Sequence, residues 1–171
     1  NGFLEIANSE PNLDVSTRQQ HVKLMAEQGK RMQNLIEDML VLTRLESIDY
    51  PMRDEYVDIH HLLDEVLVEA KVLSGNKHTL SLVCDGPDIL GGAEELRSAF
   101  SNLVSNAIRY TPEGGEIIIS WHKTIQGPAF SVEDNGIGIK QEHLARLTER
   151  FYRVDKGRSR ETQGTGLGLA I

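Results

Sequence analysis

The sequence predicts an α+β fold, a two-layer α/β sandwich preceded by a helical hairpin, and two observations support this prediction. Residues 15–48 contain no Pro and one Gly, and their apolar residues recur three, four or seven positions apart, as in one long helix. Residues 56–133 instead alternate helical periodicity with short strand-like runs, which is typical of helices that cover a sheet. We therefore expect two unequal parts, residues 1–48 and residues 49–171.

The long helix carries an apolar stripe that is wider than a two-stranded coiled-coil seam requires. The stripe comprises Leu24, Met25, Met32, Leu35, Ile36, Met39, Leu40, Leu42 and Leu45. Such a face favours a helix of a multi-helix bundle, although a helix packed on its own domain would show the same periodicity. Residues 1–8 are interpreted as the end of a preceding helix, and residues 9–12 as the turn that closes the hairpin.

The second part begins near Asp49, because Pro51 and a charged stretch end the helical pattern. Tyr56 and Val57 have strand character, and Asp58 offers an N-cap to an amphipathic helix. The apolar face of that helix would consist of Ile59, Leu62, Leu63, Val66, Leu67 and Ala70.

Alternation predicts strands at residues 80–84, 116–123 and 129–133, the last two as an antiparallel pair. A second helix is expected from Ala93 to Tyr110, because Pro and Gly follow it directly. Beyond the last strand the chain is rich in Gly, Arg and Thr, which is typical of loops.

Composition excludes several classes of function. The formal net charge of -8 repels a phosphate backbone, so no direct nucleic-acid partner is expected. Cys84 is the only cysteine, which rules out an internal disulfide, and we expect it as a small buried side chain. No apolar run approaches the ~18 residues that cross a bilayer, so this piece is expected to be soluble, although a membrane segment could lie upstream.

Two asparagines on the second predicted helix, Asn102 and Asn106, are four positions apart and would lie on one face. An amide oxygen can ligate Mg²⁺ without adding charge, while Arg109 can contact a phosphate and Tyr110 can supply an aromatic edge. Taken alone, asparagines at this spacing are more often part of a solvated surface.

Asp134 opens the run Asp-Asn-Gly-Ile-Gly-Ile directly after an apolar strand. Its carboxylate can accept a hydrogen bond from an exocyclic amine, and Gly136 and Gly138 allow the backbone to approach a ligand. Ile137 and Ile139 could then wall a flat ring. The same pattern could also be merely a turn.

Residues 164–169 form a second glycine run, in which Gly164, Gly166 and Gly168 alternate before an apolar helix start. Successive backbone N–H groups exposed there suit phosphate, although a flexible linker would have the same composition. The signature of a P-loop is absent.

Between the two glycine runs lies a cationic segment that follows Phe151 and contains Tyr152, Arg153 and Lys156. In an acidic protein this local positive charge indicates compensation for an anion, a solvated mobile lid, or both.

In this order, within residues 102–169, the motifs resemble the N, G1, F and G2 boxes of sensor histidine kinases. Residues 15–48 also resemble the second helix of their dimerisation and phosphotransfer domain, so the resemblance covers nearly the whole chain. Residues 1–48 would then be part of a four-helix dimerisation bundle, and residues 49–171 the ATP-binding catalytic domain. The implied sandwich is the one shared with gyrase-type and chaperone-type ATPases, and residues 147–156 resemble the phosphate-regulon sensor branch.

The resemblance implies ATP and Mg²⁺ as ligands. Asn106 would bind Mg²⁺, Asn102 would support the phosphates, and Asp134 would accept a hydrogen bond from the adenine amine. The other implied pocket residues are Arg109 at the phosphates, Tyr110, Gly136, Gly138 and Ile139 near the base, Tyr152, Arg153 and Lys156 at the lid, and Gly164, Thr165, Gly166, Leu167 and Gly168 over the triphosphate.

The implied activity is transfer of the ATP γ-phosphate to a histidine of the dimerisation domain, for onward transfer to an aspartate of a response regulator, in phosphate sensing. Hydrolytic relatives place a Glu where this chain has Asn102, which cannot act as a general base, so direct hydrolysis is expected to be poor. None of the six histidines has the Glu or Asp and then Pro that follow the phosphoacceptor, and the usual final strands are missing after Ile171. The sequence is therefore expected to lack both ends of the domain pair, and with them the phosphoacceptor.

The expected partners are a second copy through the helical domain and a response regulator. The expected location is the cytoplasmic portion of an inner-membrane-anchored bacterial sensor. The main alternative is a non-catalytic nucleotide-binding or dimerisation module. A protein-serine kinase or a hydrolytic ATPase is a third reading, which the long helix and Asn102 disfavour.

Overall fold

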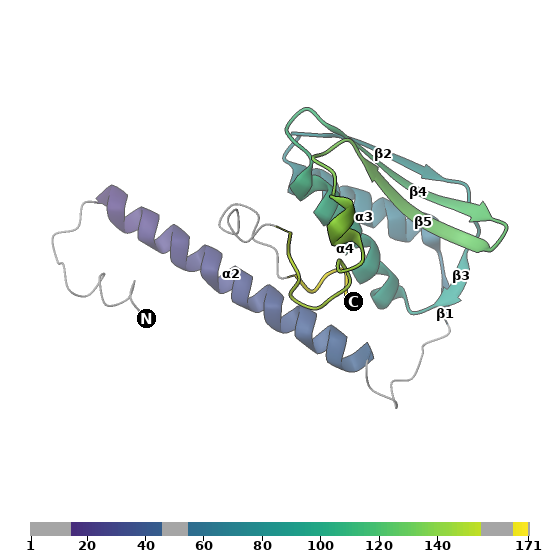
Figure 1. Cartoon of the computed structure of the whole chain (residues 1–171), viewed down its shortest axis with the longest axis horizontal. Coiled ribbons are helices and arrows are strands. Elements are labelled where there is room, and N and C mark those ends of the chain that lie inside the picture. Colours follow the sequence, from purple (N-terminus) through teal and green to yellow (C-terminus); the bar gives the residue numbers. More distant parts are fainter. Residues whose placement is uncertain (1–14, 46–54, 155–165, 171) are drawn as a thin grey trace.

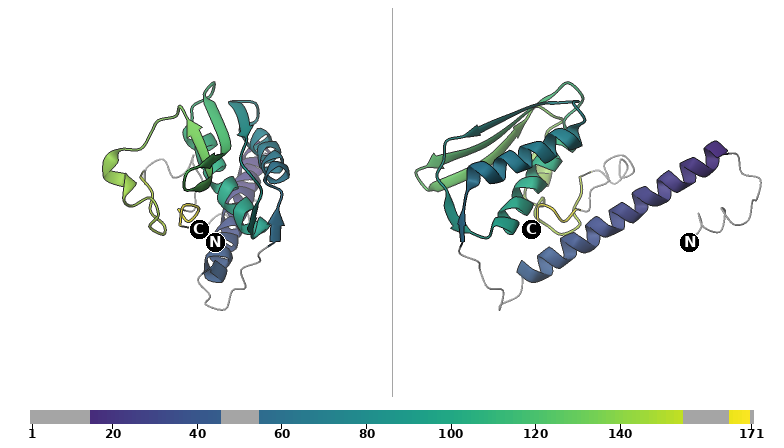
Figure 2. Two further views of the ribbon diagram at one scale, coloured as in Figure 1. Left: turned by 90° about the vertical axis from the view of Figure 1, so that its right-hand side faces the viewer. Right: turned by 180° about the vertical axis from the view of Figure 1, so that it is seen from behind.

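The computed structural model describes residues 15–45, 55–154 and 166–170. Within them a long helix, α2, stands beside a two-layer sandwich in which helices α3 and α4 cover one face of a sheet (Figures 1 and 2). The predicted α+β class is confirmed. In the described part of the chain no helix has the length and apolar character that crossing a membrane requires.

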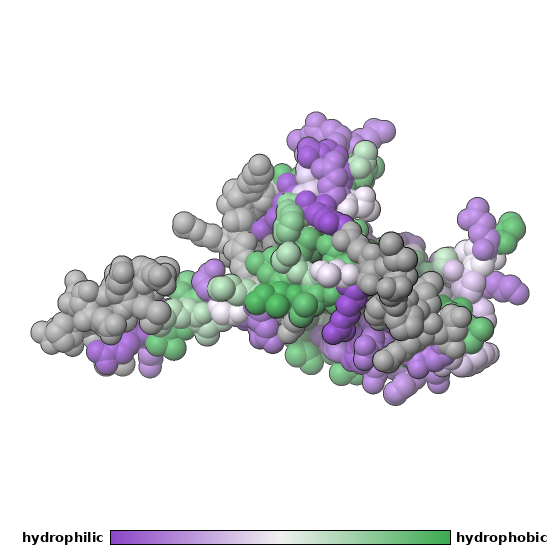
Figure 3. Space-filling model, turned by 90° about the horizontal axis from the view of Figure 1, so that it is seen from below, coloured by the Kyte–Doolittle hydropathy of each residue, from purple (hydrophilic) through white to green (hydrophobic). Residues whose placement is uncertain are grey.

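Helix α2 spans Val15–Leu45, within the long helix that the sequence predicted for residues 15–48. The predicted continuation to Ile48, the preceding helix in residues 1–8 and the boundary near Asp49 lie outside the described residues. Among the α2 side chains that the structure describes, large apolar ones are exposed at Val22, Leu24, Met32, Ile36, Met39 and Leu40. Figure 3, which views the molecule from the side where α2 lies in Figure 1, shows apolar surface gathered on this face.

The sandwich is built on a three-stranded sheet in the order β2-β4-β5. β2 (Thr79–Cys84) runs parallel to β4 (Glu116–Thr124), and β4 pairs with β5 (Gly127–Asp134) in the antiparallel manner expected. A parallel pair needs a crossover, and here α4 (Ala93–Tyr110) lies between the two strands in the chain. A separate two-stranded sheet joins β1 (Glu55–Val57) to β3 (Ile89–Gly91).

Helix α3 (Ile59–Ser74) has the boundaries that its sequence signals require. The carboxylate of Asp58 accepts a hydrogen bond from the backbone N–H of His61 at 2.9 Å, as an N-cap should. At the other end Gly75 adopts a left-handed φ of 57°, and its N–H donates to the carbonyl of Lys71. Helix α4 has the bounds predicted for it, because Pro112 follows the C-cap Thr111.

The core lies between the two helices and the sheet. Phe100 of α4 stacks on Phe130 of β5, with ring centroids 4.0 Å apart, and also meets Trp121 of β4. The indole N–H of Trp121 donates to the carbonyl of Pro87 at 2.9 Å, so this polar atom does not weaken the core. The other buried apolar residues of this core are Val57, Ile59, Leu62, Leu63, Val66, Ala70, Val104, Ala107, Ile108, Ile117 and Ile119.

Three features differ from the sequence-based expectations. The three-residue strand β3 and the one-turn helix α5 (Gln141–Leu144) were not predicted, because elements this short carry almost no periodic signal. Cys84 was expected to be buried but is only partly so, because it ends the edge strand β2. Its partial burial, together with the nearby charge of Asp85, still raises the pKa of the thiol.

Candidate functional site

Helix α4 presents two chemically different faces. Phe100, Val104 and Ile108, each four residues apart, are buried in the core. Asn102 and Asn106 lie on a different stripe and are only partly buried. The helix is thus held by one face, while the two asparagines lie outside the core.

The amide of Asn102 is the first sign that this stripe has a function. Its Nδ2 atom is buried and has no hydrogen-bond partner within the described part of the chain. A buried amide donor without a partner costs free energy, so its retention calls for an explanation. An anionic ligand is one acceptor that would satisfy it.

The first glycine run closes against the C-terminal end of α4. The backbone N–H of Ile137 donates to the carbonyl of Tyr110 at 3.2 Å. A Cβ atom on Gly136 would lie 2.5 Å from the same carbonyl oxygen, so only glycine allows this approach. The N–H of Gly136 donates in turn to the carboxylate of Asp134 at 2.9 Å. Asp134, at the exposed end of β5, is thereby held beside the end of α4.

Asn135 anchors this loop from the other side, a role that the sequence analysis did not assign. Its side-chain oxygen accepts the backbone N–H of Glu116 at 2.8 Å, and its own N–H donates to the Glu116 carbonyl. The signal for this role was an Asn directly after a strand, where its side chain can replace backbone pairing.

The second glycine run reaches the same helix at the opposite end of the amide stripe. A Cβ atom on Gly168 would lie 3.2 Å from the side-chain carbon and oxygen of Asn102, so this residue packs directly on the amide. Gly166 adopts a left-handed φ of 74°, and its carbonyl accepts the N–H of Phe151 at 2.8 Å. Leu167 between them is fully buried. Segments that are distant in the sequence therefore meet on α4.

Tyr152 is held by residues that the motif analysis overlooked. Its hydroxyl forms a 2.7 Å hydrogen bond with Nδ1 of His143, and the guanidinium of Arg146 lies 4.2 Å from its ring centroid. Arg146 also makes a forked ion pair with Glu149, and this hydrogen bonding lowers the pKa of the Glu149 carboxyl. No short sequence pattern predicts such a cluster, because its members come together only through the turns of residues 141–152.

The remaining candidate residues are placed only in part. Tyr110, Arg109, Gly138 and Ile139 are exposed, and Arg153 is partly buried. Lys156, Gly164 and Thr165 lie outside the described residues, so their predicted roles stay predictions.

The side chains on this stripe of α4 suit a hard cation that is bound together with an anionic ligand. The Oδ1 atom of Asn106 lies 3.3 Å from a guanidinium nitrogen of Arg109, which donates to it. In the described residues no group of three His, Cys, Asp or Glu side chains could hold a metal ion. The amide oxygen of Asn106 could be one protein ligand of a Mg²⁺ ion whose other ligands are waters and substrate phosphate oxygens.

Comparison with known proteins gives concordant results. Residues 91–171 match the family of histidine kinase-, DNA gyrase B- and HSP90-like ATPases. The chain is 51% identical over 149 residues to the phosphate regulon sensor protein PhoR of Pseudomonas aeruginosa, covering 86% of this chain and 34% of that protein. It is 36% identical over 173 residues to PhoR of Haemophilus influenzae, covering 99% and 40%.

A solved structure of full-length ShkA in complex with AMPPNP matches with a TM-score of 0.73 at 28% identity, covering 95% of this chain and 34% of that one. The chain thus spans about a third to two fifths of the length of these relatives.

Proposed function

The chain belongs to the sensor histidine kinases, and from this premise we propose that it binds Mg-ATP beside α4 and donates the γ-phosphate to a histidine of a dimerisation domain. The phosphate would then pass to an aspartate of a response regulator. The observation that carries the proposal is the meeting of both glycine runs on α4, one at the carbonyl of Tyr110 and one at the amide of Asn102.

Asp134 would recognise the base. Its carboxylate is exposed, and one oxygen already accepts from Gly136, which leaves acceptor capacity for the exocyclic amine of adenine. Ile137 and Ile139 are both at least half exposed beside it, and these apolar side chains would cover a flat ring. Tyr110 would line the same end of the pocket.

The amide stripe of α4 would hold the phosphates. The buried Nδ2 of Asn102 would donate to a phosphate oxygen, and Arg109 would contribute positive charge. Asn106 would ligate Mg²⁺, which supplies charge neutralisation of the triphosphate when bound. Gly166, Leu167 and Gly168 would lie over the triphosphate, with Gly164, Thr165, Lys156, Tyr152 and Arg153 as further lid residues.

Transfer to a separate acceptor is favoured over hydrolysis. An amide at position 102 cannot take a proton from water, so the site would lack a general base there. Catalysis would then rest on positioning the triphosphate and neutralising its charge. The incoming nucleophile would be an imidazole nitrogen. Unlike water, a neutral imidazole can attack phosphorus through its nitrogen lone pair without first losing a proton to a general base.

The partners and the location extend the same proposal. The exposed apolar stripe of α2 would bury itself against a second copy, because a helix of eight turns with such a face is typical of a dimerisation bundle. The similarity to PhoR supports phosphate sensing, with the chain on the cytoplasmic side of a membrane-anchored bacterial sensor. A response regulator is the expected phosphate acceptor.

Calorimetric titration with Mg-ATP tests the proposal at Asp134. Removing a charged hydrogen-bond acceptor in Asp134→Ala should weaken binding roughly ten- to a hundredfold. Asp134→Asn should weaken it similarly while still accepting from Gly136, because its amide N–H₂ cannot accept from the adenine amine. Glu133→Ala, an exposed carboxylate one residue earlier, should bind as wild type. Equal affinity in all four proteins would refute the role of Asp134, and absence of Mg-ATP binding by the wild type would refute the proposed function.

A further inference from the structure

His78 connects three elements behind the proposed base-binding end of the site. It lies between the end of α3 and the start of β2, and its imidazole is partly buried. Nε2 of the ring lies 3.0 Å from the carbonyl oxygen of Thr111, the C-cap of α4. Nδ1 lies 3.1 Å from the hydroxyl of Ser74, the last residue of α3. Both partner residues are almost completely buried.

The partners determine the direction of each hydrogen bond. A carbonyl oxygen can only accept, so Nε2 must carry a proton and donate to Thr111. In the neutral ring Nδ1 then accepts from the Ser74 hydroxyl, and that hydroxyl accepts the backbone N–H of His78 at 3.1 Å. The ring is thus held on both sides, and it holds the Thr111 carbonyl in place.

The carbonyl of Thr111 lies one residue after the carbonyl of Tyr110, which contacts the loop that follows Asp134. The carbonyl of Tyr110 accepts the N–H of Ile137, and Gly136 packs against it without room for a side chain. The end of α4 therefore contacts His78 through one carbonyl and the loop through the preceding one. A shift of Thr111 would move Tyr110, and with it the loop that orients the Asp134 carboxylate.

Neighbouring backbone hydrogen bonds also join the segment around His78 to the turn after α4. The N–H of Gly114 donates to the carbonyl of Lys77 at 2.7 Å, and the N–H of Thr79 donates to the carbonyl of Gly115 at 2.9 Å. The residues on either side of His78 therefore pair with the turn after Thr111. His78 supplies the side-chain bond at the centre of this pairing.

We propose that His78 is a positioning residue that sets selectivity for the 6-amino group of the purine, acting through Thr111 and Tyr110 on the Asp134 loop. This inference rests on the proposed nucleotide binding. The substrate class is adenine nucleotides, as opposed to purine nucleotides that lack the amine. His78 itself does not touch the nucleotide.

Two substitutions separate the two bonds of the ring. His78→Asn keeps a polar atom near the Nδ1 position, facing Ser74, but is too short to reach the Thr111 carbonyl. His78→Gln carries its N–H₂ about as far out as Nε2 and can still donate to that carbonyl. His60→Asn, an exposed histidine on α3, is the matched control.

The experiment measures calorimetric affinities of the full 171-residue chain for Mg-ATP and for Mg-purine riboside triphosphate, which lacks the 6-amino group. Wild type and His60→Asn should prefer ATP by roughly tenfold or more. In His78→Asn this preference should fall several-fold, mainly through weaker ATP binding. His78→Gln should restore most of it.

The outcomes distinguish this inference from the proposed function. If folded His78→Asn keeps the wild-type ratio of the two affinities, even with both nucleotides bound more weakly, the positioning role is overturned. The proposed nucleotide binding is not affected by that result. Failure of His78→Gln to restore the ratio also counts against it. A wild-type chain that binds neither nucleotide instead overturns the proposed function, and this inference with it. Circular dichroism melts identify variants that are folded.

Discussion

Helices α2 and α4 show the same apolar periodicity but bury it very differently. On α4, Phe100 and Val104 are 5% and 2% exposed, whereas on α2 Met32 and Ile36 are 64% and 57% exposed. The apolar face of α4 packs on its own sheet, and that of α2 faces outward within the described part of the chain. A periodic apolar stripe therefore predicts that this face of the helix packs against another apolar surface, but does not say whether that surface belongs to the same chain.

The largest expected effect is a loss of stability when the buried apolar face of α4 is altered. Phe100→Ala would remove a ring that contacts both Phe130 and Trp121, and should lower the free energy of unfolding of the sandwich by about 3–5 kcal/mol. Met32→Ala on α2 is the control and should change it by less than about 0.5 kcal/mol. Urea denaturation followed by circular dichroism measures both. Similar losses would mean that α2 is part of the same core.

The next effect concerns the outward face of α2. Ile36→Ser should weaken self-association roughly tenfold or more, because burying an Ile side chain contributes about 1.5–3 kcal/mol. The sandwich should keep its unfolding free energy. Sedimentation equilibrium measures the association constant. Gln20→Ser, on roughly the opposite side of the helix, should associate as wild type. A monomeric wild-type chain, or equal weakening in both variants, would contradict this expectation.

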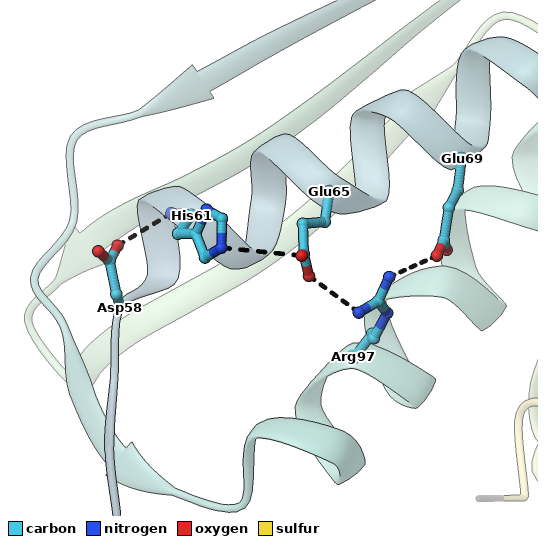
Figure 4. A network of polar contacts seen from close by, with 5 residues as sticks. All are labelled: Asp58, His61, Glu65, Glu69 and Arg97. Atoms are coloured by element: carbon cyan, nitrogen blue, oxygen red, sulfur yellow. Dashed lines mark hydrogen bonds and ion pairs between the residues drawn. The ribbon is translucent and has the colours of Figure 1, made fainter.

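The smallest effect tests how much the exposed ion pairs between α3 and α4 contribute to the stability of the sandwich. Arg97 of α4 reaches across to α3, where it pairs with Glu65 at 2.8 Å and with Glu69 (Figure 4). The hydrogen bond to Glu69 raises the pKa of Arg97, but the side chain remains 42% exposed, so solvent screens the pair.

Arg97→Met should therefore cost only about 0.5–1 kcal/mol in low salt, and less in high salt. Thermal denaturation at two salt concentrations measures this difference. His61→Ala is a suitable control, since its contact with Glu65 is longer, at 3.7 Å, and more exposed. A loss as large as that of Phe100→Ala would show that the charges, rather than the core, join α3 to α4.

Much of the fold could be predicted because its signals are local. The bounds of α4 follow from periodicity and from Pro112, and the start of α3 follows from Asp58 as N-cap. The motifs at Asp134 and Gly168 could be found for the same reason, since each is a short run of residues. Strand β3 could not be found, because its pairing with β1 depends on residues more than thirty positions away.

The sequence by itself determined which residue types stand where: a carboxylate after a strand, amides four apart on a helix, and glycines where the backbone must come close. Only the tertiary structure decided that Gly136 lies against Tyr110, that Gly168 lies against Asn102, and that His78 braces Thr111 from behind. The physical reason is that helical and strand preferences act over a few neighbouring residues, whereas these contacts arise when α4 packs on the sheet and brings distant loops to its ends.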